Sequence, residues 1–488
     1  MVLSPARLER IENHLDANHI NLLRSPPYSG KTALGQTLRD HFLGLNHEAL
    51  YITMAGIIGG KALHDNDSFD EYWKKRVGYT WHQILSCTER TYVFIDEAQI
   101  LYGDRVPFFW GPLKEILSDS AKSDALRVLL LAAYDPTFNE PTPIQFQNSL
   151  GLDTLRLSLD EFHKLTASYV ELHRSFGSPS FTVPALVETA LFNLTAGHVG
   201  ICRTALAALR HRFRFGGTVV DMLQHLVSPA FRTFLGSTRS FVWMQTWQPT
   251  NEESQFLREV FLSCDSESSF DDNLDLNEST RRKFLKSGLL ASSGRGLQLQ
   301  FAAPIMRTIL GRLLFATTRV SNPSNPTTFN EFMTRTIERM SPSALAKSLG
   351  RGVNSRLLER SWQMAWYKAA TSTSPYGSTI SPDVGSVFGS VGFLDFYVNG
   401  SYCWGVELLR EGSQIKEHAK RFVRGGQYEE IPLQEWAIVD FRHHSKAVRE
   451  LRSNFWYVLY SEDYKEAIIK RLDHDDQTIV LRGDEGFL

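Results

Sequence analysis

The chain contains 488 residues, of which 42% are hydrophobic and 22% charged, and its Lys+Arg and Asp+Glu totals of 52 and 54 leave a formal net charge of -2. A chain of this length is expected to fold into roughly two to four domains. Its hydrophobic content excludes an intrinsically disordered protein, and its near-neutral charge excludes a globally basic nucleic-acid binder. A local basic groove for nucleic acid remains compatible with this balance.

Cysteine spacing and hydropathy narrow the class of protein further. The four cysteines are widely separated and form no CxxC pair, which disfavours a zinc ribbon or a disulfide scaffold. Charged residues interrupt the first twenty positions, and no later apolar run approaches the length of about 18 residues that a membrane span needs. We therefore expect no signal peptide, no transmembrane segment and no membrane partner in this chain.

The first third of the chain alternates between buried-strand and helical patterns. Apolar runs predict five strands, at residues 20–23, 49–54, 92–96, 128–133 and roughly 154–157. Strands that alternate with helices typically form a mostly parallel sheet with both faces covered. Residues 1–160 are therefore predicted to be an α/β core domain.

Three further regions follow this core. Amphipathic stretches predict a helical lid over residues 161–240. Residues 241–320 combine a helix, an acidic linker, a second helix and a short strand pair, an order that suits a winged-helix-like module. A polar, Pro-containing linker then leads into residues 321–488, which begin with a helix and continue into strands.

The segment between the first strand and the first helix has the pattern of a phosphate-binding loop. It reads SPPYSGKT, with Ser25 in place of the usual first glycine. Backbone N–H groups of such a loop surround phosphates, and we expect Ser25, Ser29 and Gly30 to line them. Lys31 would supply positive charge and Thr32 a hydroxyl ligand for Mg²⁺, at the positive end of a helix.

The third predicted strand ends in two carboxylates, Asp96 and Glu97. Asp96 is a candidate Mg²⁺ ligand and Glu97 a candidate base for the attacking water. Tyr134 and Asp135 follow the fourth strand, where they are either a γ-phosphate sensor or an ordinary turn. Arg203 is either a residue that reaches back to the nucleotide or a solvated helix residue.

With these residues in place, the first 320 positions resemble the AAA+/STAND branch of P-loop NTPases. The resemblance implies a parallel sheet domain, a helical lid and a winged helix. It also implies that ATP binding and hydrolysis move an attached domain.

The C-terminal region contains a predicted β-hairpin around Asn399 and Gly400, with Asp395 on its first strand and Glu407 on its second. A carboxylate in apolar surroundings needs a partner, and a divalent metal is a natural one. The two acids lie on opposite faces if the turn has two residues. They share a face if the turn has three residues or if a bulge lies near Gly405. Ordinary strand-end charges are the alternative interpretation.

A helix, a hairpin, Asp on one strand and Glu on the next resemble the PD-(D/E)xK restriction-endonuclease fold. In that superfamily the acids hold Mg²⁺, which activates water for phosphodiester cleavage, and a lysine two residues past the second acid assists. Here that position is Leu409. Either Arg410, Lys416 or Lys420 substitutes from another position, or the site is impaired. Glu359, on the preceding helix, is a further candidate metal ligand beside the two hairpin acids.

Residues 407–412 read ELLREG, and the pairs Glu417-His418 and Arg421-Phe422 and the triplet 426–428, GQY, follow. This pattern resembles the C-terminal nuclease-like domain of Crinkler-type (CRN) effectors, which often follows a P-loop NTPase module. The resemblance is strongest at 19–135 and 350–430, and the ubiquitin-like header of many members is missing. It implies secretion by the parent organism, action in the host nucleus, and DNA damage or cell death. DNA and host nuclear proteins are the implied partners.

The sequence as a whole therefore predicts an α/β multidomain protein: a P-loop NTPase sheet with a lid and a winged helix, then a restriction-endonuclease-like domain. The predicted activity is that of an ATP-hydrolysing, Mg²⁺-requiring nuclease effector that acts on DNA, and a homo-oligomer stays open. The alternative is a nucleotide-dependent signalling switch whose C-terminal fold is a binding module without nuclease activity.

Overall fold

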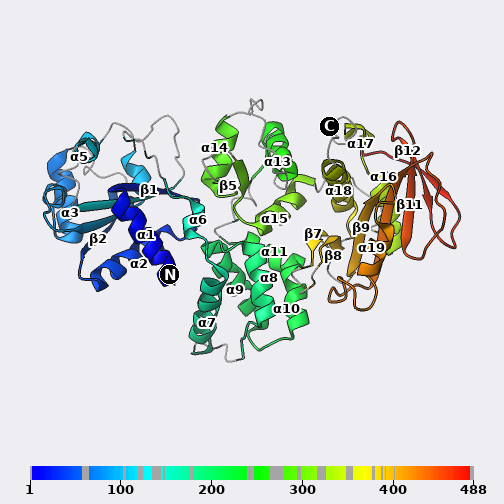
Figure 1. The fold of residues 1–488 in the computed structure, drawn as a ribbon, viewed down its shortest axis with the longest axis horizontal. Coiled ribbons are helices and arrows are strands. Elements are labelled where there is room, and N and C mark those ends of the chain that lie inside the picture. Colours follow the sequence, from blue (N-terminus) through cyan, green and yellow to red (C-terminus); the bar gives the residue numbers. More distant parts are fainter. Residues whose placement is uncertain are drawn as a thin grey trace. The chain divides into compact units, whose positions relative to one another are not determined.

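The structure is a computed structural model of the chain (Figure 1). It describes residues 3–57, 65–102, 106–118, 125–133, 144, 146, 149–175, 177, 180–238, 241, 247–263, 278–293, 298–315, 326–347, 355–375, 378, 380–385, 388, 390, 392–399 and 402–483. Within these ranges no helix is both long enough and apolar enough to cross a lipid bilayer.

The chain forms two compact units. The first comprises Met1–Tyr169, Ala196–Arg203 and Ser269–Ala302, and the second comprises Val170–Thr195, Thr204–Ser268 and Ala303–Leu488. Both units are thus assembled from segments that are distant in the sequence. The domain boundaries expected at residues 160, 240 and 320 stay predictions.

A four-stranded parallel sheet forms the centre of the first unit, in the order β1-β4-β3-β2. Its strands are β1 Ile20–Arg24, β2 Glu48–Thr53, β3 Thr91–Asp96 and β4 Leu126–Ala132. Every residue of β3 and β4 is buried, as expected for central strands of a parallel sheet with both faces covered. The four apolar runs predicted at these positions are confirmed as strands.

Five helices and two short 3-10 turns accompany this sheet. They are α1 Pro5–Ala17, α2 Lys31–Gly44, η1 Met54–Ile57, α3 Asn66–Val77, α4 Trp81–Leu85, η3 Ala98–Leu101 and α5 Pro107–Ser118. Local sequence sets several of their ends. Asp65 caps α3 by accepting from the Ser68 N–H, and Thr80 and Gln83 form a reciprocal capping box at α4.

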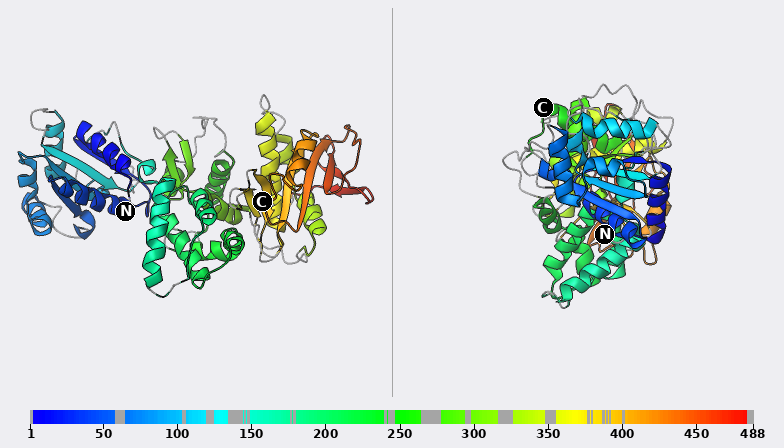
Figure 2. Two further views of the ribbon diagram at one scale, coloured as in Figure 1. Left: turned by 60° about the horizontal axis from the view of Figure 1, so that its bottom comes forward. Right: turned by 90° about the vertical axis from the view of Figure 1, so that its left-hand side faces the viewer.

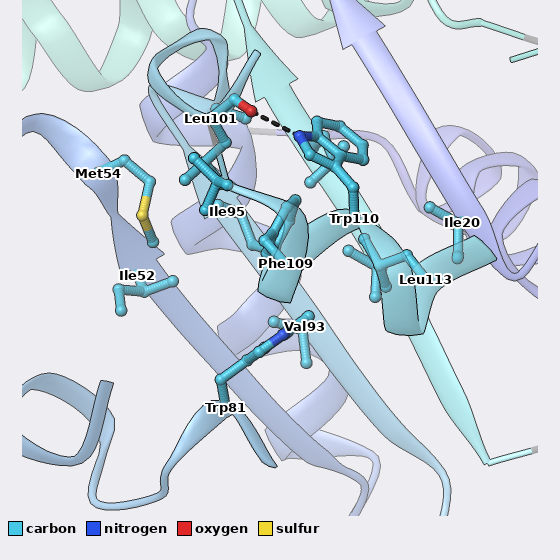
Figure 3. Packing of buried hydrophobic residues seen from close by; sticks show 14 of the residues in the cluster. Ile20, Ile52, Met54, Trp81, Val93, Ile95, Leu101, Phe109, Trp110 and Leu113 are labelled. Carbon is cyan, nitrogen blue, oxygen red and sulfur yellow. Dashed lines mark hydrogen bonds between the residues drawn. The ribbon is translucent and has the colours of Figure 1, made fainter. Parts of the chain in front are cut away.

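Side chains alternate along each strand, so the sheet has two hydrophobic layers. In one layer, α1 and α2 cover the sheet through Ile11, Leu15, Leu34, Leu38 and Phe42 (Figure 1; Figure 2). In the other, aromatic residues of α4 and α5 pack on the opposite side of the same strands (Figure 3). There the indole N–H of Trp110 donates to the Leu101 carbonyl over 2.6 Å.

The prediction of a fifth strand near residues 154–157 is wrong. Residues Leu152–Leu155 form a short helix, α6. Just before it, Leu150 forms an isolated bridge to Leu23 of β1. One isolated bridge does not continue into a strand pairing for the residues that follow, and these residues form a helix. The apolar side chains of Leu152 and Leu155 are buried as part of this helix.

Further described segments of the first unit form helices and one hairpin. The helix α7 Leu159–Ser175 begins here, as does α9 Val199–Phe213. The helix α14 Glu278–Ser287 leads into the antiparallel strands β5 Leu290–Ser293 and β6 Gln298–Phe301. The helix and strand pair expected in this region are therefore present, while their assignment to a winged helix stays a prediction.

The second unit combines helices with a seven-stranded mixed sheet. Its other helices are α8 Ala185–Thr195, α10 Val219–Leu226, α11 Pro229–Gly236, α13 Asn251–Ser263, α15 Pro304–Phe315, α16 Phe329–Glu338, α17 Pro342–Lys347, α18 Ser355–Thr373 and α19 Ile415–Arg421. Its strands are β7 Ile380–Val384, β8 Leu394–Val398, β9 Trp404–Arg410, β10 Glu435–His443, β11 Phe455–Tyr460, β12 Glu466–Lys470 and β13 Gln477–Val480. They follow the order β13-β12-β11-β10-β9-β8-β7.

Within this sheet β9, β10 and β11 are parallel, and the remaining neighbours are antiparallel. The helix α18 packs on one face, where Trp366 stacks on Phe396 at a centroid distance of 4.6 Å. The helix α19 packs on the other face, where Phe422 stacks on Trp436 at 4.0 Å. Alternation along β9 therefore decides which side chains meet α18 and which meet α19.

The hairpin between β8 and β9 is not closed by a tight Asn-Gly turn. Its strands are joined by residues 399–403, and Val398 pairs with Trp404. The side-chain amide of Asn399 is buried and donates to the Val227 carbonyl. Local preference predicts Asn399 in a two-residue turn, but its side chain instead forms a tertiary hydrogen bond.

We predict that Phe42→Ala strongly destabilises the first unit. Phe42 is fully buried and stacks on Tyr92 at 3.7 Å, so the change should cost about 3–5 kcal/mol. Its neighbour Leu43 is 47% exposed, and Leu43→Ala should stay within about 0.5 kcal/mol of wild type. Denaturant unfolding of the full chain, followed by hydrogen exchange in β3 and β4, measures both effects. Equal losses in the two variants would contradict the packing described for α2.

Candidate functional site

The loop between β1 and α2 is closed by its own polar groups. Ser25 and Ser29 form a hydrogen bond of 2.7 Å between their hydroxyls. The ammonium of Lys31 turns back on the loop and donates to the carbonyls of Ser25 and Pro26 over 2.9 and 2.8 Å. Gly30 adopts φ 101°, a left-handed conformation that favours glycine. The structure therefore brings together the residues predicted to surround phosphates.

The first turn of α2 is joined to the end of β3. The hydroxyl of Thr32 donates to Oδ2 of Asp96 over 2.7 Å, and the hydroxyl of Tyr51 donates to the same oxygen over 2.8 Å. Mg²⁺ prefers hydroxyl, carboxylate, water and phosphate oxygens. Thr32 and Asp96 supply two such oxygens at the start of a helix and the end of a strand, so the residues present fit the ion.

Glu97 directly follows this strand in a left-handed conformation, with φ 55°. Its N–H donates to Oδ1 of Asp96 over 3.0 Å. The side chain of Gln99 holds the carboxylate of Glu97 and also accepts from the Ala133 N–H over 3.0 Å. The end of β3 is thereby linked to the end of β4, and Glu97 has a defined orientation.

Burial shapes the electrostatics of this site. It lowers the pKa of Lys31 to about 8, although the nearby carboxylates of Glu97 and Asp96 oppose the shift. Burial and the hydrogen bond to Asp96 raise the pKa of Tyr51, so its hydroxyl remains a donor at all ordinary pH values. The ammonium of Lys31 thus lies in surroundings that favour an added negative charge.

The beginning of α9 packs against the phosphate-binding loop. A Cβ at Gly200 would lie 2.4 Å from the Tyr28 carbonyl, and a Cβ at Gly30 would lie 3.4 Å from Val199. Gly200 is therefore required for the close approach of the two segments, whereas Gly30 is favoured by its left-handed backbone conformation. Arg203 lies about one turn further along α9 and is exposed, a position that leaves its side chain accessible.

The turn after α14 also lies against this loop. A Cβ at Gly288 would lie 3.1 Å from Pro26 and 3.3 Å from Pro27. The prolines of the loop are thus contacted by the segment that precedes β5. Tyr134 and Asp135, the alternative sensor residues, lie outside the described residues.

The parallel sheet, the loop after β1 and the Thr32–Asp96 bond together define a P-loop NTPase fold for this part of the first unit. The strand order places β4 between β1 and β3. The carboxyl ends of these strands meet at one edge of the sheet, which is where open α/β sheets bind ligands.

The second candidate site lies where β8 and β9 diverge. Phe396 pairs with Val406, and the same register places Asp395 opposite Glu407. The ladder ends there, because Oδ2 of Asp395 takes the place of a backbone acceptor and receives the Leu408 N–H over 2.7 Å. The Asp395 N–H in turn points to Oε2 of Glu407 at 3.4 Å. The long connection, rather than a three-residue turn, makes the two acids neighbours.

Glu407 is only 1% exposed, and its carboxylate is fully partnered. Nδ1 of His418 and Nη1 of Arg421 lie 2.6 and 2.7 Å from Oε1, and the Tyr428 hydroxyl donates to Oε2 over 2.9 Å. Burial lowers the pKa of Arg421, but Tyr428 and Glu407 raise it overall. The buried charge of Glu407 is thus balanced by a hydrogen-bonded cation from α19.

The predicted substitutes for the missing lysine do not meet Glu407. Arg410 alternates to the other face of the sheet, where its guanidinium lies over Trp362 at 5.6 Å. Lys416 and Lys420 are two positions from His418, about 200° around the helix, and both are exposed. The cation beside the acid pair is Arg421 instead.

A metal at this second site would depend on few protein ligands. In the part of the chain that the structure describes, no group of three or more His, Cys, Asp or Glu side chains is arranged to hold a metal. Glu359 belongs to α18, but its side chain lies outside the described residues. From the same helix Gln363 donates to Oδ1 of Asp395 over 2.9 Å. Mg²⁺ is often held by one or two carboxylates plus water and substrate phosphates, so Asp395 and Glu407 fit that mode.

Sequence reasoning assigned no role to several residues of these sites. Tyr51 and Gln99 orient Asp96 and Glu97, and Tyr428 holds Glu407. Tyr51 precedes the last residue of β2 by two positions, so a polar group at the end of a buried strand was a usable signal. Tyr428 belongs to the GQY triplet on which the resemblance rests, but nothing local placed it beside Glu407, because it lies in a loop far from β9 in the sequence.

No protein-family model and no curated protein matches the chain. Among solved structures, a Walker-type ATPase of Pyrococcus abyssi aligns at 13% identity over 64% of this chain and 96% of that chain, with a TM-score of 0.37. AMPPCP-bound DnaA from Aquifex aeolicus aligns at 13% identity over 55% of this chain and 81% of that chain, with a TM-score of 0.30. Drosophila ORC bound to DNA aligns at 11% identity over 68% and 85%, with a TM-score of 0.29. Because these TM-scores are low, the fold assignment rests on the sheet order and the loop geometry.

We predict that the affinity for a nucleoside triphosphate falls as pH rises above about 8. The pKa of Lys31 is lowered to about 8 by burial, and bound phosphates would favour its charged form. Above that pH, binding must take up a proton, so affinity should approach a tenfold loss per pH unit. Titration of a fluorescent ATP analogue at pH 7, 8, 9 and 9.5 measures it. Calorimetry at pH 8 in two buffers should show uptake of about half a proton. A flat profile from pH 7 to 9 would contradict the role given to Lys31.

Proposed function

We propose that the first unit binds and hydrolyses ATP with Mg²⁺. The observation that carries this proposal is the hydrogen bond of 2.7 Å between Thr32 and Asp96, beside the Lys31 ammonium, which donates to two carbonyls of its own loop. In this arrangement the positive charge of Lys31 is held next to a helix N-terminus. It has neutral carbonyl partners that a phosphate can replace.

Each residue of the loop has a distinct task in this proposal. Lys31 exchanges its bonds to the Ser25 and Pro26 carbonyls for phosphate oxygens, while Thr32 and Asp96 hold the magnesium ion. When bound, Mg²⁺ neutralises charge that develops on the phosphates during transfer. Glu97, oriented by Gln99, accepts a proton from the attacking water.

We further propose that the C-terminal sheet carries a metal-dependent nuclease-like site at Asp395 and Glu407 that acts on DNA. Its support is the juxtaposition of the two acids between β8 and β9, with Arg421 and His418 alongside. The order of α18, the hairpin and α19 agrees with the helix and hairpin on which the resemblance to the PD-(D/E)xK fold rests. In the proposed reaction the acids would hold the metal, and the guanidinium of Arg421 would meet the phosphate.

The alternative function is an ATP-dependent switch without nuclease activity, and the partners of Glu407 favour it. A metal at this carboxylate must compete with Arg421, His418 and Tyr428. A hydrogen bond to a charged group contributes about 1.5–3 kcal/mol. An acid locked in this way serves equally well to hold α19 on the sheet.

The finer assignments remain predictions that follow from resemblance. They comprise membership of the Crinkler-type effectors, secretion, action in a host nucleus and damage to host DNA. DNA is the proposed partner of the C-terminal sheet. Binding to host nuclear proteins and assembly into a homo-oligomer are further predictions from the sequence.

We predict that Lys31→Ala abolishes ATP hydrolysis. Loss of the ammonium removes the only cation described at the loop's carbonyls, so turnover should fall at least about a hundredfold. Phosphate release from ATP and Mg²⁺ measures the effect. Lys114→Ala, which removes an exposed lysine of α5, is the control and should keep wild-type turnover. The ATPase proposal fails if the two variants hydrolyse ATP at the same rate.

We predict that Asp395→Asn and Glu407→Gln each abolish DNA cleavage and leave ATP hydrolysis within about twofold of wild type. Plasmid nicking with Mg²⁺, in the presence and absence of ATP, measures cleavage. Glu462→Gln, at an exposed carboxylate, should cut as fast as wild type. Nicking by Asp395→Asn at the wild-type rate would sink the nuclease proposal. A wild-type protein that hydrolyses ATP but cuts no DNA would support the alternative function, an ATP-dependent switch.

A further inference from the structure

A polar pocket of about 370 Å³ lies at the amino ends of β10 and β11, where the start of α16 and the turn between β12 and β13 also meet. Its lining includes the indole rings of Trp436 and Trp456, the guanidinium groups of Arg452 and Arg471, and the carboxylates of Glu435 and Asp473. None of them belongs to the acid pair of Asp395 and Glu407. The pocket therefore is a separate feature of the C-terminal sheet.

Arg471 is the principal charged group of the pocket. Its guanidinium lies over the ring of Trp456 at 4.2 Å and donates to Oδ1 of Asn330 over 2.9 Å. Burial lowers the pKa of Arg471. Among the described residues, the structure gives this guanidinium no carboxylate within 4.0 Å. A partly desolvated cation with a neutral partner favours an anionic ligand.

Arg452 adds a second guanidinium that is readily available. Its carboxylate partner is Glu450, at 2.8 Å, and the side chains are 32% and 69% exposed. Exposed ion pairs of this kind contribute only about 0.2–1 kcal/mol. A phosphate can therefore displace Glu450 from Arg452 at small cost.

Besides its two arginines, the pocket offers an aromatic ring and two carboxylates to a ligand. Trp436 presents a partly exposed aromatic ring, and the carboxylates of Glu435 and Asp473 also line the cavity. These acids balance the arginines, so net charge does not select the ligand. Carboxylates accept hydrogen bonds from the amino groups of bases, as they do from cytosine N4. A base against the indole and a phosphate on the guanidinium groups use all of these partners.

An aromatic stack connects the pocket to the acid pair. Trp436 stacks on Phe422 at 4.0 Å with planes 9° apart. The next residue toward the N-terminus, Arg421, donates to Glu407 over 2.7 Å. Trp436 and Glu407 therefore lie on the α19 side of the sheet, while Trp456, which pairs with Val439, lies on the α18 side. A strand of nucleic acid that meets both Trp436 and Arg471 would cross the amino ends of β10 and β11.

We propose that this pocket binds one nucleotide of the nucleic-acid strand on which Asp395 and Glu407 act. The inference rests on the proposed nuclease-like function, because that function supplies the strand. Arg471 and Arg452 hold a phosphate, and the ring of Trp436 receives the base. The pocket thus sets how the strand lies across the acid pair.

The test is binding of a labelled eight-nucleotide oligodeoxycytidylate, measured by fluorescence anisotropy in EDTA. The full chain carries Lys31→Ala throughout, so that the phosphate-binding loop does not contribute. Arg471→Gln should weaken binding about tenfold, the effect of one lost charge-assisted contact, and Arg452→Gln should weaken it severalfold. Arg449→Gln, at an exposed arginine that does not line the pocket, is the matched control and should change affinity less than twofold. Thermal unfolding of each variant shows that it folds.

Three results would overturn the inference. The first is equal affinity of Arg471→Gln and Arg449→Gln, and the second is a chain with Lys31→Ala alone that does not bind the oligonucleotide. The third is competition by inorganic phosphate at the same concentration as dCMP, which would identify an anion site without base recognition. We expect dCMP to compete at a concentration at least tenfold lower. The binding assay contains EDTA, so it does not depend on cleavage. A protein that binds the oligonucleotide in this assay but never cuts DNA with Mg²⁺ would refute the nuclease proposal and leave the binding proposal for the pocket standing.

Discussion

The hydrogen bond from Thr32 to Asp96 is the contact on which the nucleotide site depends. It joins the first turn of α2 to the end of β3, although β4 lies between β3 and β1, the strand that precedes α2. Tyr51 donates to the same carboxylate from β2. Three strands therefore converge on one oxygen atom. The site forms only if these strands are parallel and end at the same edge, so the hydrophobic layers on both faces of the sheet position the chemistry.

The two candidate sites treat buried charge in opposite ways. Lys31 is held by neutral carbonyls, and burial lowers its pKa, so a phosphate improves its surroundings. Glu407 already has a guanidinium partner, and removing one member of a buried ion pair typically costs about 3–5 kcal/mol. The first arrangement is ready for a ligand, whereas the second must exchange existing partners. ATP binding is accordingly the better supported of the two proposals.

Local sequence predicted which residues meet in the proposed nucleotide site, and it predicted the C-terminal acid pair in part. The loop before α2 and the acids after β3 are adjacent to their strands, so their positions follow from strand ends. The cation beside Glu407 did not follow from spacing, because Arg410 alternates to the α18 face while Arg421 arrives from α19. The prediction of a tight turn at Asn399 was wrong for a related reason, because the side-chain amide of Asn399 donates to the carbonyl of Val227, which is distant in the sequence.

The amino-acid sequence by itself determined the alternation of strands and helices, the phosphate-binding loop, and the pairing of two acids with one hairpin. These features depend on residues that are close together in the chain, where periodicity and backbone preference act. Tertiary structure decided the strand count, the register that places Asp395 opposite Glu407, and the meeting of Trp436, Trp456 and Arg471 around one pocket. Those contacts join distant segments, and their free energy comes from burial and charge pairing that no local pattern encodes.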